Sequence, residues 1–200
     1  FAFLLNNYCN VSMDKTREFL SNLTDGALQI SKGMICGLSK EFSEKSKAEQ
    51  SQAFLNLVAA PVLHVDFTSA KVNGKNVNVA ICTTPQEAVY FAREHKGHKG
   101  IKDTPAELNP NTLVHDHDRT FYSYGKLHQE CVIHILRYLL DSIQNEKGLT
   151  WNTQMRELLR EMIHYRKNLD PEEDLDPVKV EAFEERFGHI IDIANREHEY

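Results

Sequence analysis

The chain has 200 residues, of which 41% are hydrophobic and 26% are charged, with nine glycines and six prolines. This composition is typical of a globular protein and excludes a disordered chain or a collagen-like repeat. No apolar run approaches the roughly 20 residues that a membrane-spanning helix needs, so we predict a cytoplasmic protein without a membrane span. The first residue is Phe1 rather than Met, and we interpret the chain as an excised fragment.

The charge is unevenly distributed. Residues 151–200 contain seven Lys and Arg against thirteen Asp and Glu, so this segment carries the whole net charge of -6. Nucleic-acid binding needs clustered basic residues, and the only dense basic run lies within residues 95–102. The four cysteines form no C-x-x-C pair, which argues against a zinc ribbon and indicates reduced thiols.

The N-terminal part is predicted to be helical. Apolar spacing predicts helices over residues 13–23 and 31–45, with Ser12 and Ser31 as their N-cap candidates, followed by a third helix-like segment at 53–59. Two helices joined by a turn fit either a helix-turn-helix or an ordinary helical hairpin. In the helix-turn-helix interpretation, Lys32 is a DNA phosphate contact.

A change of period after residue 60 indicates strands. Residues 62–68, 77–83 and the segment from residue 88 predict an antiparallel meander, with Asn73-Gly74 as the first hairpin turn. Residues 112–114 predict a fourth, short strand.

The rest of the chain is predicted to be helical. Thr150 is expected to cap a second helix of this region, and a third contains apolar residues from Val180 to Ala194. The first of these helices carries an apolar stripe formed by Leu127, Cys131, Ile135, Leu139 and Ile143.

Two acidic residues lie in or directly after predicted strands. Asp66 lies within the first strand, where a buried carboxylate is unfavourable unless it is compensated, and Asp116 follows the fourth strand. Two carboxylates on neighbouring strands repel each other, and a hard divalent cation such as Mg²⁺ removes that repulsion. The alternative is that backbone amides satisfy each carboxylate separately.

Three segments of the chain also resemble a known family: His64-Val65-Asp66-Phe67-Thr68; Leu113-Val114-His115-Asp116 with Tyr122-Ser123-Tyr124-Gly125; and His128-Gln129-Glu130-Cys131-Val132-Ile133-His134 with Arg137-Tyr138. They resemble the catalytic region of bacterial insertion-sequence transposases of the IS66 type, through about residue 165. The resemblance implies a ribonuclease-H-like fold and an Asp, Asp, Glu triad that binds two Mg²⁺ ions, with Mn²⁺ as a substitute.

The resemblance assigns roles to individual residues. Asp66 corresponds to the first acid, although the family more often has Glu at the position of Phe67. Asp116 corresponds to the second acid, with Asp118 as the alternative.

A Cys-x-x-His pair follows the second acid in many such transposases, and Cys131 and His134 match it. We expect a packed cysteine and a hydrogen-bonded histidine behind the active site, with His128 as a further supporting residue.

The third acid is where the chain departs from the family. In the family it follows an inserted helical region, in an Asn-rich segment that precedes Glu-Arg, and this sequence has no such segment. We therefore expect a fragment with two of three acids, inactive on its own. The remaining glutamates considered, none with the required context, are Glu184, Glu185, Glu197 and Glu199.

Two other metal sites fit the histidines less well. A His-Asp metallophosphohydrolase carries its His-Asp pair on helices, whereas His115 and Asp116 close a strand. The other is a zinc site formed by His128, Cys131 and His134. On one predicted helix, His128 and His134 diverge by about 120°, so they cannot both join Cys131 at one zinc ion without distortion.

DNA backbone contacts are predicted in the basic run. Lys96, Lys99 and Lys102 alternate with glycines, whose flexibility would let lysines and backbone amides approach phosphates. The alternative is a solvated loop.

We therefore predict an α/β protein with a ribonuclease-H-like mixed sheet, an N-terminal helical segment and a C-terminal helical insertion. The expected parts are residues 1–60, 61–145 and 146–200. The expected function is DNA transposition by magnesium-dependent strand cleavage and transfer, with DNA and further copies of the protein as partners. The alternative is a non-catalytic DNA-binding or partner-binding remnant of a transposase.

Overall fold

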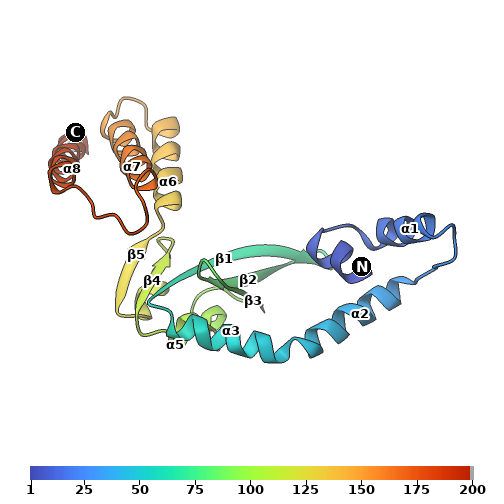
Figure 1. Ribbon diagram of the computed structural model, residues 1–200. Helices are drawn as coiled ribbons and strands as arrows, with labels where there is room; N and C mark the ends of the chain where they lie inside the picture. Colours follow the sequence, from blue (N-terminus) through green and yellow to red (C-terminus); the bar gives the residue numbers. More distant parts are fainter. Residues whose placement is uncertain (199–200) are drawn as a thin grey trace. The chain divides into compact units, whose positions relative to one another are not determined.

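The computed structural model describes residues 1–198 (Figure 1). The chain divides into two compact units, Phe1–Asn111 and Thr112–Tyr200. The predicted division into residues 1–60, 61–145 and 146–200 stays a prediction. Glu199, one of the glutamates considered as a third acid, lies outside the described residues.

The first unit begins with helices. A buried cluster of Ala2, Leu20, Ile30 and Ile35 holds this region together. The elements are η1 (Leu4–Tyr8), a π-helical turn, α1 (Met13–Leu23), α2 (Lys32–Lys45) and α3 (Lys47–Ala59).

The two predicted serine caps are confirmed. The Ser12 hydroxyl accepts a hydrogen bond from the Lys15 amide at 3.3 Å, and the Ser31 hydroxyl accepts one from the Met34 amide at 3.0 Å. The connection over residues 24–31 is longer than the turn of about 3–4 residues in a helix-turn-helix, so α1 and α2 form a helical hairpin.

The helix α3 begins earlier than predicted. Residues 47–52 are mostly polar and carry no apolar periodicity, but several are good helix formers, and they extend the predicted segment 53–59 towards the N-terminus.

Strands β1 (Val62–Val72), β2 (Lys75–Thr83) and β3 (Ala88–Arg93) form the predicted antiparallel meander. The turn between β1 and β2 has positive φ at Asn73 (51°) and at Gly74 (76°), as a two-residue hairpin turn requires. Because β3 pairs only with residues 78–83 of β2, the hairpin tip is a ribbon of two strands.

Short helices complete the first unit: α4 (His98–Ile101) and α5 (Pro105–Leu108). The buried Asn109 side chain donates hydrogen bonds to the carbonyls of Leu57 (3.0 Å) and Ala60 (2.8 Å), which joins the end of α3 to the segment after α5. Burial raises the pKa of the Cys82 thiol on β2 to about 11, so this thiol is un-ionised at neutral pH.

The second unit begins with a parallel pair of strands, β4 (Thr112–His115) and β5 (Leu127–Glu130), connected through η2 (Phe121–Ser123), a short 3-10 helix. The prediction of helix from Leu127 onwards was wrong. Residues 127–130 pair with β4, and the helix begins only at residue 132.

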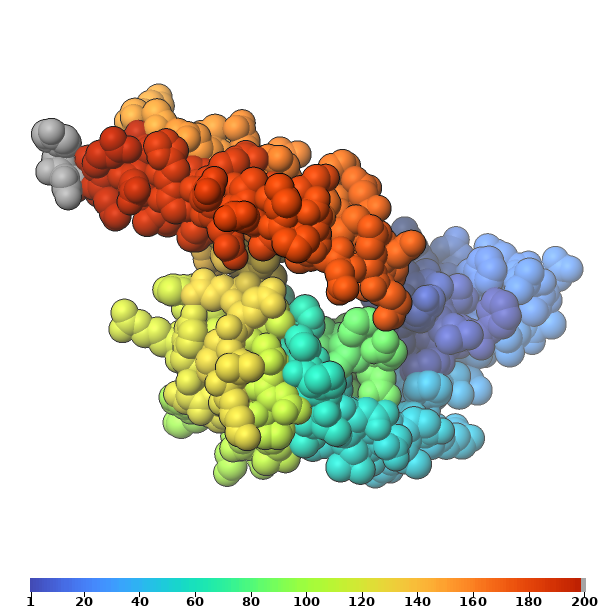
Figure 2. Space-filling view, turned by 60° about the vertical axis from the view of Figure 1, so that its left-hand side comes forward, coloured from blue at the N-terminus to red at the C-terminus, as the bar shows by residue number. Residues whose placement is uncertain are grey.

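Three helices follow: α6 (Val132–Asn145), α7 (Trp151–Lys167) and α8 (Pro177–His198). Figure 2 shows α8, in red, lying along α7, in orange. The buried core shared by α6, α7 and α8 consists of Leu139, Met155, Leu158 and Ile190.

The cap of α7 differs from the prediction. Thr150 occupies the N-cap position, but its side chain makes no cap hydrogen bond. The Glu197 carboxylate instead accepts hydrogen bonds from the amides of Thr150 (2.8 Å) and Trp151 (3.1 Å). The pKa of Glu197 is lowered, mainly by the hydrogen bond from the Thr150 hydroxyl.

The protein is therefore of the α/β class, with antiparallel and parallel strand pairs, and this architecture is compatible with a ribonuclease-H-like fold. Among the described helices, none combines the length and the apolar character needed to cross a bilayer.

Gly100 in α4 lies in a space that has no room for a larger side chain. A Cβ atom at this position would lie 2.5 Å from the His95 carbonyl oxygen and 2.8 Å from the Phe67 ring. We expect Gly100→Ala to lower the free energy of unfolding by about 1–3 kcal/mol, because this space is already filled. The measurement is urea denaturation followed by circular dichroism.

The matched control is Gly37→Ala in α2, where a Cβ atom meets nothing within 4 Å. It should raise stability by about 0.5–1 kcal/mol, because alanine favours the helix. Equal effects of the two substitutions would contradict the packing described at Gly100.

Candidate metal and nucleic-acid site

Asp66 lies on β1, in the first unit. It is half-buried and lies opposite Ile81 of β2. One carboxylate oxygen, Oδ1, accepts a hydrogen bond from the Phe67 amide at 2.7 Å. The other oxygen accepts no hydrogen bond recorded among residues 1–198, so it is available to a ligand.

Asp116 directly follows β4, in the second unit, and is also half-buried. Its Oδ1 atom accepts a hydrogen bond from the Asp118 amide at 3.1 Å, while the Asp118 carboxylate accepts one from the Thr120 amide at 2.8 Å. Asp118 therefore stabilises the turn that carries Asp116.

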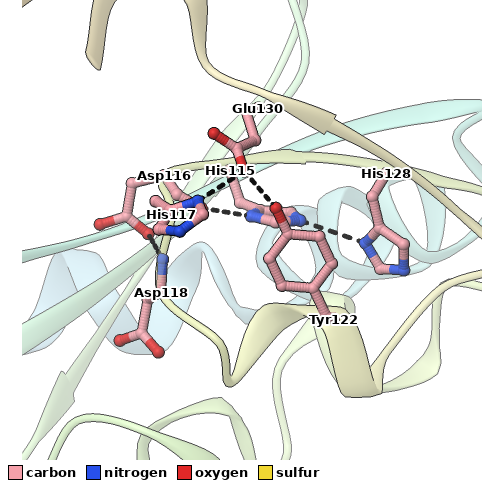
Figure 3. Close-up of polar contacts among 7 residues, drawn as sticks. All are labelled: His115, Asp116, His117, Asp118, Tyr122, His128 and Glu130. Carbon is pink, nitrogen blue, oxygen red and sulfur yellow. Dashed lines mark hydrogen bonds and ion pairs between the residues drawn. The ribbon is translucent and has the colours of Figure 1, made fainter. Parts of the chain in front are cut away.

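The backbone of Asp116 is held by His115, which is 1% exposed. The Nδ1 atom of His115 lies 2.5 Å from the Asp116 carbonyl oxygen, and its Nε2 atom lies 3.1 Å from Nδ1 of His128 (Figure 3). Because a carbonyl can only accept, Nδ1 of His115 carries a proton. In the neutral ring Nε2 then accepts, and His128 donates through its own Nδ1.

Glu130, at the end of β5, holds the other side of the same turn. Its Oε1 atom accepts hydrogen bonds from Nδ1 of His117, at 2.6 Å, and from the hydroxyl of Tyr122 (Figure 3). The Tyr122 hydroxyl first, and His117 second, lower the pKa of Glu130. The same hydrogen bond raises the pKa of Tyr122.

His128 does not lie where the sequence predicted. It is on β5, opposite Leu113 of β4, and not on a helix with Cys131 and His134. Burial, and then repulsion from His115, lower the pKa of His128, so the ring is neutral at physiological pH. Within either unit, the described residues form no group of three His, Cys, Asp or Glu that could share an ion.

Cys131 and His134 lie at the beginning of α6. Cys131 is the N-cap residue, and its amide donates a hydrogen bond to the His115 carbonyl at 2.6 Å. His134 was expected to be hydrogen-bonded, but its buried Nδ1 atom has no partner among the described residues. A ring nitrogen of His134 lies within 4.8 Å of a carboxylate oxygen of Asp116.

The basic run is more ordered than a flexible loop. Gly100 is buried in α4 and its amide donates to the Gly97 carbonyl at 2.9 Å, so this amide is not free to bind a phosphate. Arg93 fixes the segment by donating to the carbonyls of Gly100 and Lys102, both at 3.0 Å.

The predicted DNA-binding lysines differ in their surroundings. Lys96, Lys99 and Lys102 are exposed on this ordered segment. Lys32, in contrast, forms an ion pair with Asp14 at 2.8 Å, which partly neutralises it.

Sequence reasoning missed the role of Glu130. Glu130 lies opposite His115 in the register of β4 and β5, and this register places it beside the turn after β4. In the sequence, Glu130 lies within the segment 128–134 that resembles the family, but this resemblance assigns no role to it.

The chain matches a model of a known protein family. A family model described as "Transposase IS66 family" matches residues 15–192, most of the chain. The chain belongs to the IS66 transposase family. Its members are DDE transposases, which act on DNA with divalent metal ions. No curated protein matches the chain significantly.

The contact between Glu130 and the turn makes stability depend on pH. The pKa of Glu130 is lower in the folded state than the unfolded value of about 4.3. The contribution of Glu130 to the free energy of unfolding is therefore complete above about pH 4.3, and it is lost as the pH falls through the lower pKa of the folded state. At pH 7 we expect Glu130→Gln to destabilise this IS66 transposase by about 1 kcal/mol, a low figure because the site is partly exposed.

The measurement is urea denaturation of both proteins between pH 7 and pH 3.5. The difference should shrink below about pH 4, where Glu130 becomes protonated. Glu157→Gln, at an exposed position on α7, is the control and should show no such trend. A difference for Glu130→Gln that is independent of pH would contradict the proposed charge contacts.

Proposed function

We propose that this IS66-family protein acts in DNA transposition, by magnesium-dependent strand cleavage and transfer, and that Asp66 and Asp116 hold the metal ions. The family match over residues 15–192 carries this proposal. The half-buried carboxylates support it, since each has one oxygen oriented by a backbone amide and a second oxygen without a recorded partner.

The donor set fits a hard divalent cation. Mg²⁺ prefers carboxylate oxygens and completes its coordination with water or phosphate oxygens. Bound between enzyme and DNA, such ions would activate a water or a terminal 3′-hydroxyl and stabilise the leaving oxygen of an in-line displacement. Mn²⁺ would substitute for Mg²⁺.

The protein's own residues then have three tasks. Asp66 and Asp116 bind the ions, and the turn contacts of His115 and Glu130 keep Asp116 oriented. Lys96, Lys99 and Lys102 bind the DNA backbone, while a third acid has no assigned position in this chain. Self-association on DNA is part of the proposal.

The metal site is tested by calorimetric titration of the chain with Mn²⁺ and Mg²⁺. Asp66→Asn and Asp116→Asn should each lose most of the binding, because each removes a charged ligand. Asp103→Asn is a control at an exposed turn residue with φ of 58°, a conformation that asparagine tolerates. Unchanged binding in both test variants would contradict the metal assignment, and DNA binding without metal binding would favour a non-catalytic remnant.

The DNA contact is tested by replacing Lys96, Lys99 and Lys102 with alanine together. The plot of log affinity against log salt has a negative slope. If each lysine neutralises one phosphate, the size of this slope should decrease by about 0.9 for each lysine removed, or about 2.7 for all three. The measurement is fluorescence anisotropy with duplex DNA at several salt concentrations.

A matched control replaces three lysines of the second unit, and it should leave the slope nearly unchanged. Lys32→Ala alone should have a smaller effect than one lysine of the basic run, because Asp14 already pairs with it. Equal slopes for the test and control proteins would exclude the basic run as the DNA contact. The control lysines are Lys147, Lys167 and Lys179.

A further inference from the structure

We propose that His134 is a nitrogen ligand to the divalent ion held by Asp116, so that the site accepts ions that bind imidazole and not Mg²⁺ alone. This inference rests on the proposed metal site and deepens it. Two observations within the second unit carry it: the distance between His134 and Asp116, and a buried Nδ1 atom of His134 that has no hydrogen-bond partner among the described residues.

The first observation is geometric. A ring nitrogen of His134 lies within 4.8 Å of a carboxylate oxygen of Asp116. Two ligand atoms about 2.0–2.2 Å from one ion lie up to about 4.4 Å apart, so a small rotation of either side chain lets one ion contact both.

The second observation is the buried Nδ1 atom of His134, which has no hydrogen-bond partner among residues 1–198. Buried polar atoms are nearly always paired, and an unpaired one calls for a physical explanation. Metal binding at this ring is such an explanation, because coordination orders an imidazole ring and satisfies one of its nitrogens.

The surroundings prepare Asp116 for such an ion. Its backbone is fixed by His115, and its Oδ1 atom is oriented by the Asp118 amide. His134 is placed near it by the first turn of α6, which begins after the hydrogen bond from the Cys131 amide to the His115 carbonyl. Both ligands therefore belong to one short, well-connected part of the second unit.

A mixed set of carboxylate and imidazole changes which ions bind. Carboxylates suit Mg²⁺ and Mn²⁺, whereas imidazole suits later transition metals such as Fe²⁺ and Zn²⁺. With His134 as a ligand, Mn²⁺ should bind more tightly than Mg²⁺, and replacement of His134 should reduce this preference.

The test uses the chain with Mn²⁺ alone and pulsed electron paramagnetic resonance. Imidazole nitrogen bound directly to Mn²⁺ gives a characteristic modulation of the electron spin echo. We expect this modulation in the unmodified protein and its loss in His134→Asn, together with a loss of Mn²⁺ affinity of about 10-fold or more. His164→Asn is the control, since His164 lies on α7 and contacts Asn168.

The outcomes separate this inference from the proposed function. If Mn²⁺ binds and Asp116→Asn abolishes binding, but no nitrogen modulation is seen, His134 is not a ligand and the proposed metal site stands. If no Mn²⁺ binds, the proposed metal site itself fails, and the inference fails with it. Modulation that persists in His134→Asn would assign the nitrogen to another histidine and overturn the inference.

Discussion

The turn that carries Asp116 depends on one buried imidazole ring. His115 is enclosed in the second unit, and its protonated Nδ1 atom bonds to the carbonyl of the residue whose carboxylate we place at the metal. Its other nitrogen contacts His128 on β5, and its own carbonyl accepts from Cys131 at the beginning of α6. One side chain thus links a strand end, a neighbouring strand and a helix, and a change at His115 disturbs all three.

The acidic residues around this turn have different roles. One carboxylate oxygen of Asp116 accepts no hydrogen bond from the residues that the structure describes, which leaves it available to a cation. Glu130, by contrast, accepts two hydrogen bonds on a single oxygen, from His117 and Tyr122, and so stabilises the turn. Glu197 accepts from the first amides of α7. These contacts give Glu130 and Glu197 structural roles.

Features fixed by neighbouring residues could be predicted from the sequence. The caps at Ser12 and Ser31 and the turn at Asn73-Gly74 depend on local chemistry, and all three are confirmed. Strand β5 could not be predicted in the same way. It is only four residues long, its apolar Leu127 continues the spacing of α6, and its pairing depends on β4, which lies far from it in the sequence. The site shows the same division: Asp116 was visible because it ends an apolar strand, whereas the role of Glu130 follows from strand register alone.

The ribbon at the tip of β1 and β2 has a consequence for dynamics. Residues 75–77 of β2, next to the turn, pair with no third strand among the described residues, and residues 68–72 of β1 are exposed. Two strands alone are only marginally stable in water, so their backbone amides should exchange with solvent by local opening, without unfolding of the whole unit. The half of β1 that contains Asp66 is paired where β2 is also covered by β3, and it belongs to the slowly exchanging part. The same strand therefore joins a rigid segment, on which a reactive group can be held still, to a segment that can deform against a large partner.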